Sequence, residues 1–269
     1  MSRTRFAGRR VLVTGASRGI GAATAQRFAA EGADVAIVAR TLERHDHLAG
    51  SLRETAARIE TLGSRAAVIT ADLTDGDDRA RIVPSAVDEL GGPVDILVNN
   101  AAAAMYGPTR DLSLKRRRVI FEVNVHAPLD LAQAVIPSMV ERGEGWIINI
   151  SSATARPIAN STMTVYGASK AALNRLTHGL AFELAGSGIR VNGVEPRAAV
   201  MSEGATALIG EAVRADQIES MEAMVEAIVA LADCRADFTA RNCVSLDLID
   251  ELRLSVHALD GTPLANRSE

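Results

Sequence analysis

The chain has 269 residues, 48% of them apolar, which is enough to bury a large core in one α/β domain spanning residues 1–269. Its net charge of −4 gives no support for binding to nucleic acid or to a membrane surface. The start of the chain shows no signal-peptide pattern, and no apolar run reaches the length of about 18 residues that suggests a membrane span. Two cysteines without partners at metal-ligand spacing are typical of reduced thiols, so we expect a cytoplasmic protein without a bound metal.

A glycine-rich turn follows the first predicted strand, which covers residues 10–14. The turn reads Gly15-Ala-Ser-Arg-Gly-Ile-Gly21 and leads into a predicted helix over 22–31. Backbone N–H groups at such a turn, together with the helix dipole, can bind a pyrophosphate. The Gly-x-x-x-Gly-x-Gly spacing differs by one residue from the common dinucleotide fingerprint. We predict a dinucleotide site here, with tight strand–helix packing as the alternative role of the glycines.

Two arginines indicate which dinucleotide binds. Arg40 ends the second predicted strand, over residues 34–40, where NAD-binding proteins usually carry an acid for the ribose 2′-hydroxyl. Arg18 lies inside the glycine turn, and both guanidinium groups could pair with a 2′-phosphate. We therefore favour NADP as the cofactor, with NAD still possible if Arg40 is only a solvated strand end.

The hydrophobic pattern then predicts a helix, a strand, a helix and a strand over residues 41–62, 64–71, 77–90 and 95–99. Asp72 and Leu73 end the third strand, where they would meet an adenine ring. Asn99 ends the fourth strand, and the carboxyl ends of parallel strands form the ligand crevice of an open sheet. The residues 45–47 (His-Asp-His) lack a further ligand, so a solvated helix start is favoured over a metal site.

A long helical segment is predicted over residues 112–142, bent near its two prolines, Pro128 and Pro137. Asn124 lies in an apolar part of this segment, where a polar amide requires a partner or a function. The basic run Arg116–Arg118 is interpreted as a solvated face.

The stretch from Trp146 to Lys170 carries the candidate chemistry. A buried strand over 146–150 ends at two serines, and a helix over 168–184 follows. Tyr166 and Lys170 are four residues apart, so both would lie on one face of this helix. A phenol with a pKa of about 10 is a poor base at neutral pH. A neighbouring ammonium group would lower that pKa, and a serine hydroxyl could hold a substrate oxygen against the phenol.

The last part of the chain continues the alternation, with a strand over 188–195 ending at Pro196, an alanine-rich flap over about 197–218, a helix over 219–232, a strand over 242–248 and a polar, frayed tail from about 258. Strands that alternate with helices throughout predict a doubly wound parallel sheet of the Rossmann type in a single domain.

In the motifs that it combines, the chain resembles the short-chain dehydrogenase/reductase family. The matching segments are Thr14–Gly21, Asp72-Leu73, Asn99-Asn-Ala101, Asn124, Ile150-Ser-Ser152, Tyr166-Gly-Ala-Ser-Lys170 and Arg190-Val-Asn192. The resemblance extends over about residues 6–250. It implies that the cofactor contacts Gly15, Ser17, Arg18, Gly19, Ile20, Gly21, Arg40, Asp72, Leu73, Asn99, Ala101, Tyr166, Lys170 and Pro196.

The resemblance also implies an NAD(P)-dependent oxidoreductase that interconverts a secondary alcohol and a carbonyl by hydride transfer. Tyr166 would be the general acid/base, and Lys170 would bind the nicotinamide ribose and lower the pKa of Tyr166. Ser152, rather than Ser151, would hold the carbonyl or hydroxyl group. Asn124 would position a water molecule between Lys170 and the solvent.

Four departures from the family pattern concern the loops. Ala102 replaces a glycine, Arg197 replaces the glycine that usually follows Pro196, and Met201 replaces a threonine. Glycines expected after the last strand are replaced by residues 247–250. None of these changes removes a proton-transfer residue, but they put the loop path after Pro196 and the substrate choice in question.

We expect a small-molecule carbonyl or alcohol substrate that is medium-sized and hydrophobic, and that would pack on residues 103–106, 153–156, Met163 and the flap. We also expect a homodimer or homotetramer formed by the helices around 112–142 and 162–185. Two other interpretations are a non-catalytic dinucleotide-binding sensor or scaffold of the same fold, and a sugar-nucleotide epimerase or dehydratase of a longer type. Retention of the serine, the tyrosine and the lysine together favours the enzyme.

Overall fold

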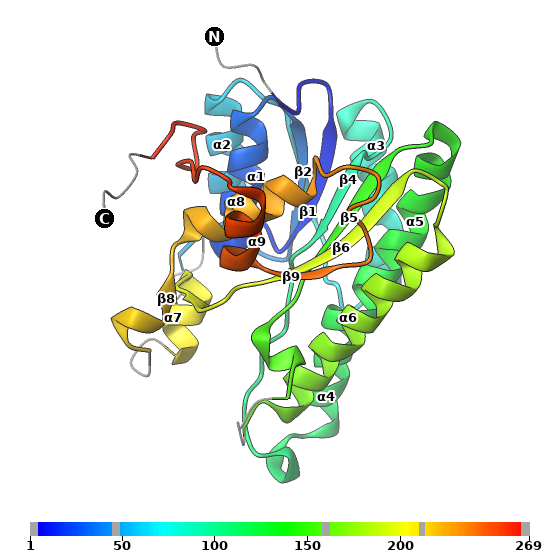
Figure 1. Ribbon diagram of the computed structural model, residues 1–269. Coiled ribbons are helices and arrows are strands. Elements are labelled where there is room, and N and C mark those ends of the chain that lie inside the picture. Colours follow the sequence, from blue (N-terminus) through cyan, green and yellow to red (C-terminus); the bar gives the residue numbers. More distant parts are fainter. Residues whose placement is uncertain (1–4, 45–48, 158–161, 210–212, 265–269) are drawn as a thin grey trace.

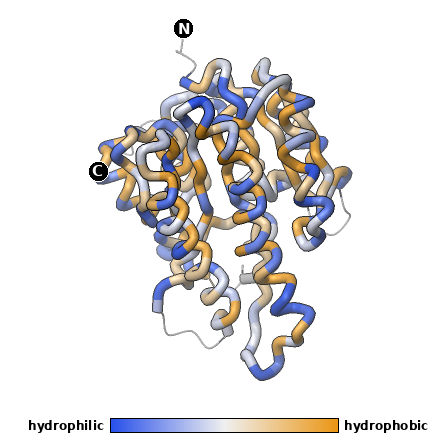
Figure 2. The backbone as a smooth tube through the Cα atoms, turned by 90° about the vertical axis from the view of Figure 1, so that its right-hand side faces the viewer, coloured by the Kyte–Doolittle hydropathy of each residue, from blue (hydrophilic) through white to orange (hydrophobic). Residues whose placement is uncertain are grey.

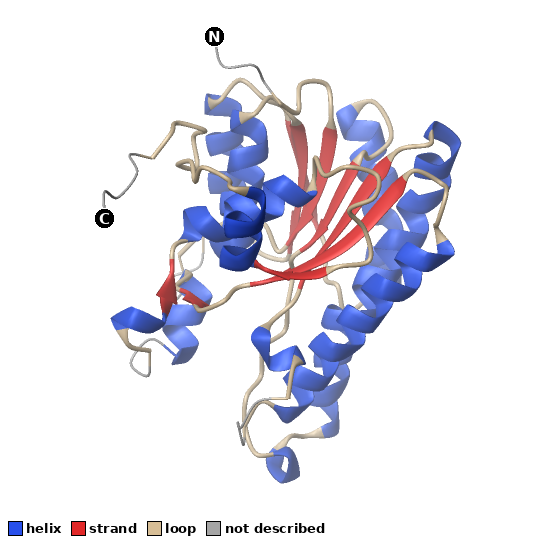
Figure 3. Ribbon diagram, in the orientation of Figure 1, coloured by secondary structure: helices blue, strands red, loops and turns tan. Residues whose placement is uncertain are grey.

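The computed structural model describes residues 5–44, 49–157, 162–209 and 213–264. Its centre is a sheet of seven parallel strands in the order β3-β2-β1-β4-β5-β6-β9 (Figures 1 and 3). The strands are β1 (Arg10–Thr14), β2 (Asp34–Ala39), β3 (Ala66–Thr70), β4 (Ile96–Asn99), β5 (Gly145–Ile150), β6 (Ile189–Glu195) and β9 (Asn242–Val244). This confirms the predicted doubly wound sheet.

The central strands are buried on both faces because helices cover the sheet on each side. Every residue of β4 and β5 is buried, in agreement with their continuous apolar sequences. The chain runs from β1 outward to β3 and then returns to β4 on the other side of β1. The strand order therefore reverses between β1 and β4, and ligands of such sheets bind at the carboxyl ends of the strands at this point.

Two layers of helices enclose the sheet. The helices are α1 (Gly19–Ala30), α2 (Leu52–Thr61), α3 (Gly76–Leu90), α4 (Leu114–Phe121), α5 (Ala127–Arg142), α6 (Thr164–Glu183), α7 (Glu203–Ile209), α8 (Met221–Leu231) and α9 (Ser245–Leu252). Helices α1, α2, α8 and α9 contribute side chains such as Phe28 and Met224 to one apolar core. Helices α3, α5 and α6 contribute side chains such as Ile82 and Leu131 to the core on the opposite face (Figure 1).

The helix predicted over residues 41–62 is wrong in its first half, because α2 begins only at Leu52. Gly50 has a left-handed backbone (φ +94°), which interrupts a helix. Ser51 then caps α2, accepting a hydrogen bond from the N–H of Glu54 at 3.1 Å. The candidate metal run at 45–47 lies outside the described residues.

The helical segment predicted over 112–142 is confirmed from residue 114 onward, with an irregular turn just before Pro128. A π-helical turn, Glu122–His126, separates α4 from α5, and Pro128 lies in the first turn of α5. Among the described helices, the run Leu114–Arg142 is long and apolar enough to cross a membrane by length and composition alone. The apolar side of α5 packs on the sheet through Leu131 and Val135, which accounts for part of that composition.

The end of the chain also differs from the prediction. The strand expected over 242–248 ends at Val244, and residues 245–252 form α9 instead. The described part of the tail, up to residue 264, is not frayed. Its turn is closed by Thr262, which donates to Asp260 through its backbone N–H, and by a β-bridge between His257 and Pro263.

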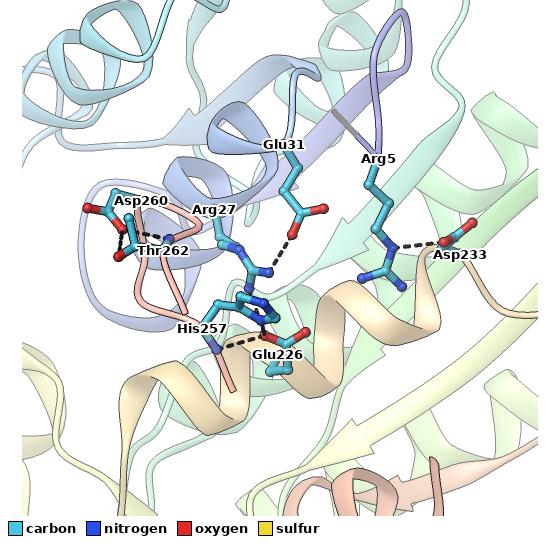
Figure 4. Close-up of polar contacts among 8 residues, drawn as sticks. All are labelled: Arg5, Arg27, Glu31, Glu226, Asp233, His257, Asp260 and Thr262. Carbon is cyan, nitrogen blue, oxygen red and sulfur yellow. Dashed lines mark hydrogen bonds and ion pairs between the residues drawn. The ribbon is translucent and has the colours of Figure 1, made fainter. Parts of the chain in front are cut away.

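A buried charged network fixes the start of this tail (Figure 4). Arg27 of α1, 2% exposed, donates to the Glu226 carboxylate of α8 at 2.9 Å and also pairs with Glu31. The backbone N–H of His257 donates to Glu226 at 3.1 Å, and its ring lies at the same distance from that carboxylate. Glu226 therefore links α1, α8 and the tail.

Candidate active site

A cleft of about 460 Å³ opens at the point where the strand order reverses. It is lined by seven of the residues expected to contact a cofactor, namely Gly15, Ser17, Arg18, Arg40, Asp72, Leu73 and Ala101. The other expected residues do not line it: Gly19, Ile20, Gly21, Asn99, Tyr166, Lys170 and Pro196. The shape and lining fit the adenosine and phosphate part of a dinucleotide.

The glycine turn is held against the end of β4. Gly15 has a φ of +68°, and a Cβ there would lie 2.8 Å from the Cα of Ala101, so no larger residue fits. The Thr14 hydroxyl accepts hydrogen bonds from the N–H groups of Asn100 and Ala101, each at 3.1 Å. The Asn100 amide donates to the Thr14 carbonyl at 2.9 Å. These contacts join the two strand ends that flank the cleft.

Arg18 and Arg40 both line the ribose end of the cleft. Arg18 donates from Nη2 to the carbonyl of Gly50 at 2.9 Å, while its buried Nε has no hydrogen-bond partner among the described residues. Arg40 is 73% exposed, and its Nη1 lies 3.9 Å from the Asp72 carboxylate, which is too far for a hydrogen bond. Both guanidinium groups thus keep donors free for an anion.

Ser152, Tyr166 and Lys170 come together at the carboxyl end of β5. Tyr166 and Lys170 lie on α6, as their spacing predicted, and the Tyr166 hydroxyl bonds to Ser152. The Ser152 oxygen accepts from the N–H of Thr154 at 3.3 Å and from its hydroxyl at 2.9 Å, which leaves the Ser152 O–H as the donor. Ser151 points elsewhere and donates to Asn174 at 2.6 Å, in agreement with the choice of Ser152.

Lys170 is almost completely buried, with 1% of its surface exposed. Its Nζ donates to the carbonyl of Ile150 at 2.7 Å and lies 5.9 Å from the centre of the Tyr166 ring. Burial lowers the pKa of Lys170 to about 8.

The net pKa of Tyr166 is raised in this structure, not lowered as the spacing to Lys170 led us to expect. Burial raises the pKa of Tyr166 well above its usual value, the nearby Tyr106 raises it further, and the hydrogen bond from Ser152 opposes the change. Removal from water disfavours the phenolate more than the neighbouring groups favour it. Tyr166 is therefore a protonated phenol at neutral pH.

Asn124 is fully buried in the π-helical turn and ties the catalytic helix to the loop after β4. Its Oδ1 accepts from the N–H of Ala103 at 2.8 Å, and its Nδ2 donates to Ser169 of α6 at 3.0 Å. The side chain of Asn124 thus joins two segments of the site, while its expected contact with a water molecule stays a prediction.

The side chain of Asn99 has a different environment from the one expected. It points below the strand end, where its amide donates to Asn149 at 2.9 Å, and Asn149 donates in turn to Thr177 of α6 at 2.9 Å. Successive side chains of a strand point to opposite faces. The Asn99 side chain is therefore part of the sheet–helix interface, and the next residue, Asn100, lines the cleft.

Two contacts near the site were not predicted from the sequence. The ring of Tyr106, in the loop after β4, packs edge-to-face on the ring of Tyr166, with centroids 5.7 Å apart. The carboxylate of Glu203, at the start of α7, accepts a hydrogen bond from the N–H of Gly19 at 3.0 Å. This N–H begins α1 and is one of the donors that such a turn offers to a pyrophosphate. From the sequence we expected Tyr106 in the substrate pocket and Glu203 in the flap, but neither contact follows from a motif.

Residues 9–212 match the family model described as "short chain dehydrogenase". The chain belongs to this family. It is 39% identical over 186 residues to a short chain dehydrogenase of Pseudocercospora fijiensis, a match that covers 68% of this chain and 57% of that relative. It is 34% identical over 252 residues to L-xylulose reductase of Mesocricetus auratus, covering 90% of this chain and 96% of the relative.

A solved structure of a blue fluorescent protein from a metagenomic library, in complex with NADPH, matches with a TM-score of 0.76 at 32% identity. The match covers 89% of this chain and 97% of that structure. The resemblance inferred from the sequence motifs is confirmed, and this short chain dehydrogenase is an NAD(P)-dependent oxidoreductase.

Arg197 and Asp247, which both depart from the family pattern, contact each other in this short chain dehydrogenase. Arg197, after β6, makes an ion pair with Asp247 of α9. The Arg197 N–H also donates to Glu219 at 2.8 Å and to Ser245 at 3.1 Å. The segment that replaces the expected glycines therefore holds the loop after Pro196 in a defined path.

Proposed function

We propose that this short chain dehydrogenase reduces a carbonyl compound with NADPH, with Tyr166 as the proton donor. The observation that carries the proposal is the buried phenol of Tyr166, bonded to Ser152 and next to Lys170, at the end of β5. The phenol holds its proton at neutral pH and can donate it, and the ammonium group of Lys170 beside it favours the phenolate that the transfer leaves.

The proton path follows from the hydrogen bonds. The lone pairs of the Ser152 oxygen are both engaged by Thr154. Its O–H can therefore donate to a carbonyl oxygen placed against Tyr166. Tyr166 then donates its proton to the same oxygen as negative charge develops there. Lys170, charged below about pH 8, favours the phenolate that remains after the transfer. When bound, the nicotinamide supplies the hydride.

The preference for NADPH is supported by the two arginines in the cleft. Arg18 and Arg40 have unused donors, and no acidic side chain at the end of β2 replaces them. A guanidinium group matches the two oxygens of a phosphate in a bidentate geometry. The apolar side chains near Tyr106, namely Ala104, Met105 and Val119, support a hydrophobic section of the substrate.

The test is hydride transfer from NADPH to a panel of carbonyl compounds, compared between the wild type and Tyr166→Phe. The substitution should lower kcat by about 10²–10⁴-fold while the Kd for NADPH changes less than about twofold. Tyr106→Phe is the matched control, since it also removes one phenol hydroxyl but keeps the ring contact. A Tyr166→Phe variant that retained most of its kcat would contradict the assignment. NADPH binding without turnover of any carbonyl would favour the sensor or scaffold.

We also propose a cytoplasmic homodimer or homotetramer that uses α4, α5 and α6. Large apolar side chains are exposed on these helices, with Phe182 72% exposed, Leu114 53% and Val140 47%. Val140 and Phe182 lie near the carboxyl ends of α5 and α6, and Leu114 begins α4, so these helices offer apolar surface to another subunit. Light scattering at micromolar concentration should give a dimer or tetramer, and Phe182→Glu should shift it toward the monomer. A monomeric wild type would refute the proposal.

A further inference from the structure

The start of α4 carries four consecutive cations, Lys115 to Arg118, which the proposed reaction does not use. All four are exposed, and none forms an ion pair with a described residue. Other arginines of the described chain are commonly paired, for example Arg79 with Glu122 at 2.8 Å. The run is thus an unneutralised positive patch on a chain whose net charge is −4.

The position of these cations is unfavourable for the helix itself. The first turn of α4 contains no acidic residue, although the positive end of the helix dipole favours acids there and disfavours lysine and arginine. The patch lies near the lower end of the molecule, where α4 begins (Figures 1 and 2). A feature that does not serve helix stability calls for another role.

A cavity of about 600 Å³ lies beside this patch. It is lined by Ala104, Met105, Tyr106, Ser113, Lys115, Arg116 and Val119. Three of these, Ala104, Met105 and Val119, also line the cofactor cleft, so the two spaces adjoin. Tyr106 lines this cavity and also contacts the ring of Tyr166, with centroids 5.7 Å apart. Tyr106 therefore connects the cavity with the proposed proton donor.

We infer that this cavity binds an anionic group of the substrate, a phosphate or a carboxylate, at a distance from the carbonyl that is reduced. The inference rests on the proposed function and extends it to the substrate class. Lys115 offers a mobile ammonium and Arg116 a forked guanidinium, a combination suited to an anion with several oxygens. Tyr106, which lines the cavity and contacts Tyr166, packs against the carbon chain between the two ends. The substrate has a carbonyl, a short apolar spacer and an anion.

Arg117 and Arg118 provide a matched control within the same run. They carry the same charge on the same helix but do not line the cavity. The ordinary explanation of such a run is a solvated basic face. In that case, removing Lys115 and Arg116 would weaken anion binding as much as removing Arg117 and Arg118. A binding site loses affinity only with Lys115 and Arg116.

The test is calorimetric titration of the NADPH-saturated protein with phenyl phosphate, benzoate and benzyl alcohol. Saturation with NADPH fills the cofactor site, so the added anions cannot bind where the phosphates of the cofactor bind. The wild type should bind an aromatic anion and not the neutral alcohol, and the phosphate and carboxylate arms identify the anion. Lys115→Ala with Arg116→Ala should weaken that binding about tenfold or more, whereas Arg117→Ala with Arg118→Ala should weaken it less than about threefold.

Three results would overturn the inference: no anion binding by the wild type, equal losses in the two double variants, or equal binding of the alcohol. Removing cations from the first turn of α4 should leave the thermal stability unchanged or raise it. If a variant loses anion binding while its Tm is not lowered, the loss is therefore not caused by unfolding. NADPH binding is measured first. If NADPH did not bind, the proposed function would be refuted. The same anion titration of the cofactor-free protein would then test the anion site independently of that function.

Discussion

Replacing Glu203 by glutamine should tighten cofactor binding. The Glu203 carboxylate accepts from the N–H of Gly19 at 3.0 Å, and α1 has no acidic residue of its own in its first turn. A bound pyrophosphate takes over this N–H, so the carboxylate must leave first. A hydrogen bond to a charged acceptor is worth about 1.5–3 kcal/mol, against about 0.5–1.5 for a neutral one. Since Glu203 is exposed, we take about 1 kcal/mol, which corresponds to a roughly fivefold lower Kd.

The assay is fluorescence titration with NADPH at low salt, repeated at high salt, where the difference between wild type and Glu203→Gln should shrink. Glu183→Gln is the control, since it removes an exposed carboxylate at the far end of α6. An unchanged or weaker affinity in Glu203→Gln would show that the carboxylate does not compete with the cofactor.

Three further predictions concern cofactor choice, pH dependence and stability. Arg40→Ala should lower kcat/KM for NADPH about tenfold and leave NADH nearly unchanged in steady-state assays; equal losses with both cofactors would contradict the proposed role. Burial lowers the pKa of Lys170 from 10.5 to about 8, so between these values the native state has released a proton that the unfolded chain retains. The contribution of Lys170 to the free energy of unfolding therefore rises with pH in this window, by at most about 1.4 kcal/mol per pH unit. Urea unfolding should show this slope in the difference between the wild type and Lys170→Met, and a flat difference would be inconsistent with it. Glu226→Ala leaves the Arg27 guanidinium buried without its main partner and should cost about 3–5 kcal/mol in urea unfolding; a loss below about 1 kcal/mol would mean that the pair does not stabilise the fold.

The fold was largely predictable because its strands are continuous apolar runs that alternate with helices. The errors fall where a local device overrides the pattern. The helix over 41–62 starts late because Gly50 adopts a left-handed backbone and Ser51 provides the cap. The strand over 242–248 stops at Val244 because residues 245–252, with apolar side chains at helical spacing, form α9.

The site was predictable only in part. Motif spacing brought Ser152, Tyr166 and Lys170 together, but it gave the wrong direction for the pKa of Tyr166. That direction depends on burial and on Tyr106, a residue 60 positions earlier in the chain. The side chain of Asn99 was expected in the cleft and lies in a buried network with Asn149.

The sequence by itself determined the parallel sheet, the glycine turn and the grouping of Ser152, Tyr166 and Lys170, because these depend on periodicity and on short spacings along the chain. Only the tertiary structure decided the contact of Glu203 with Gly19, the pairing of Arg197 with Asp247 and the cavity beside Lys115. These features join segments far apart in the chain. The packing that joins them also removes water from Tyr166 and Lys170, and this sets their pKa values in a way that no local pattern records.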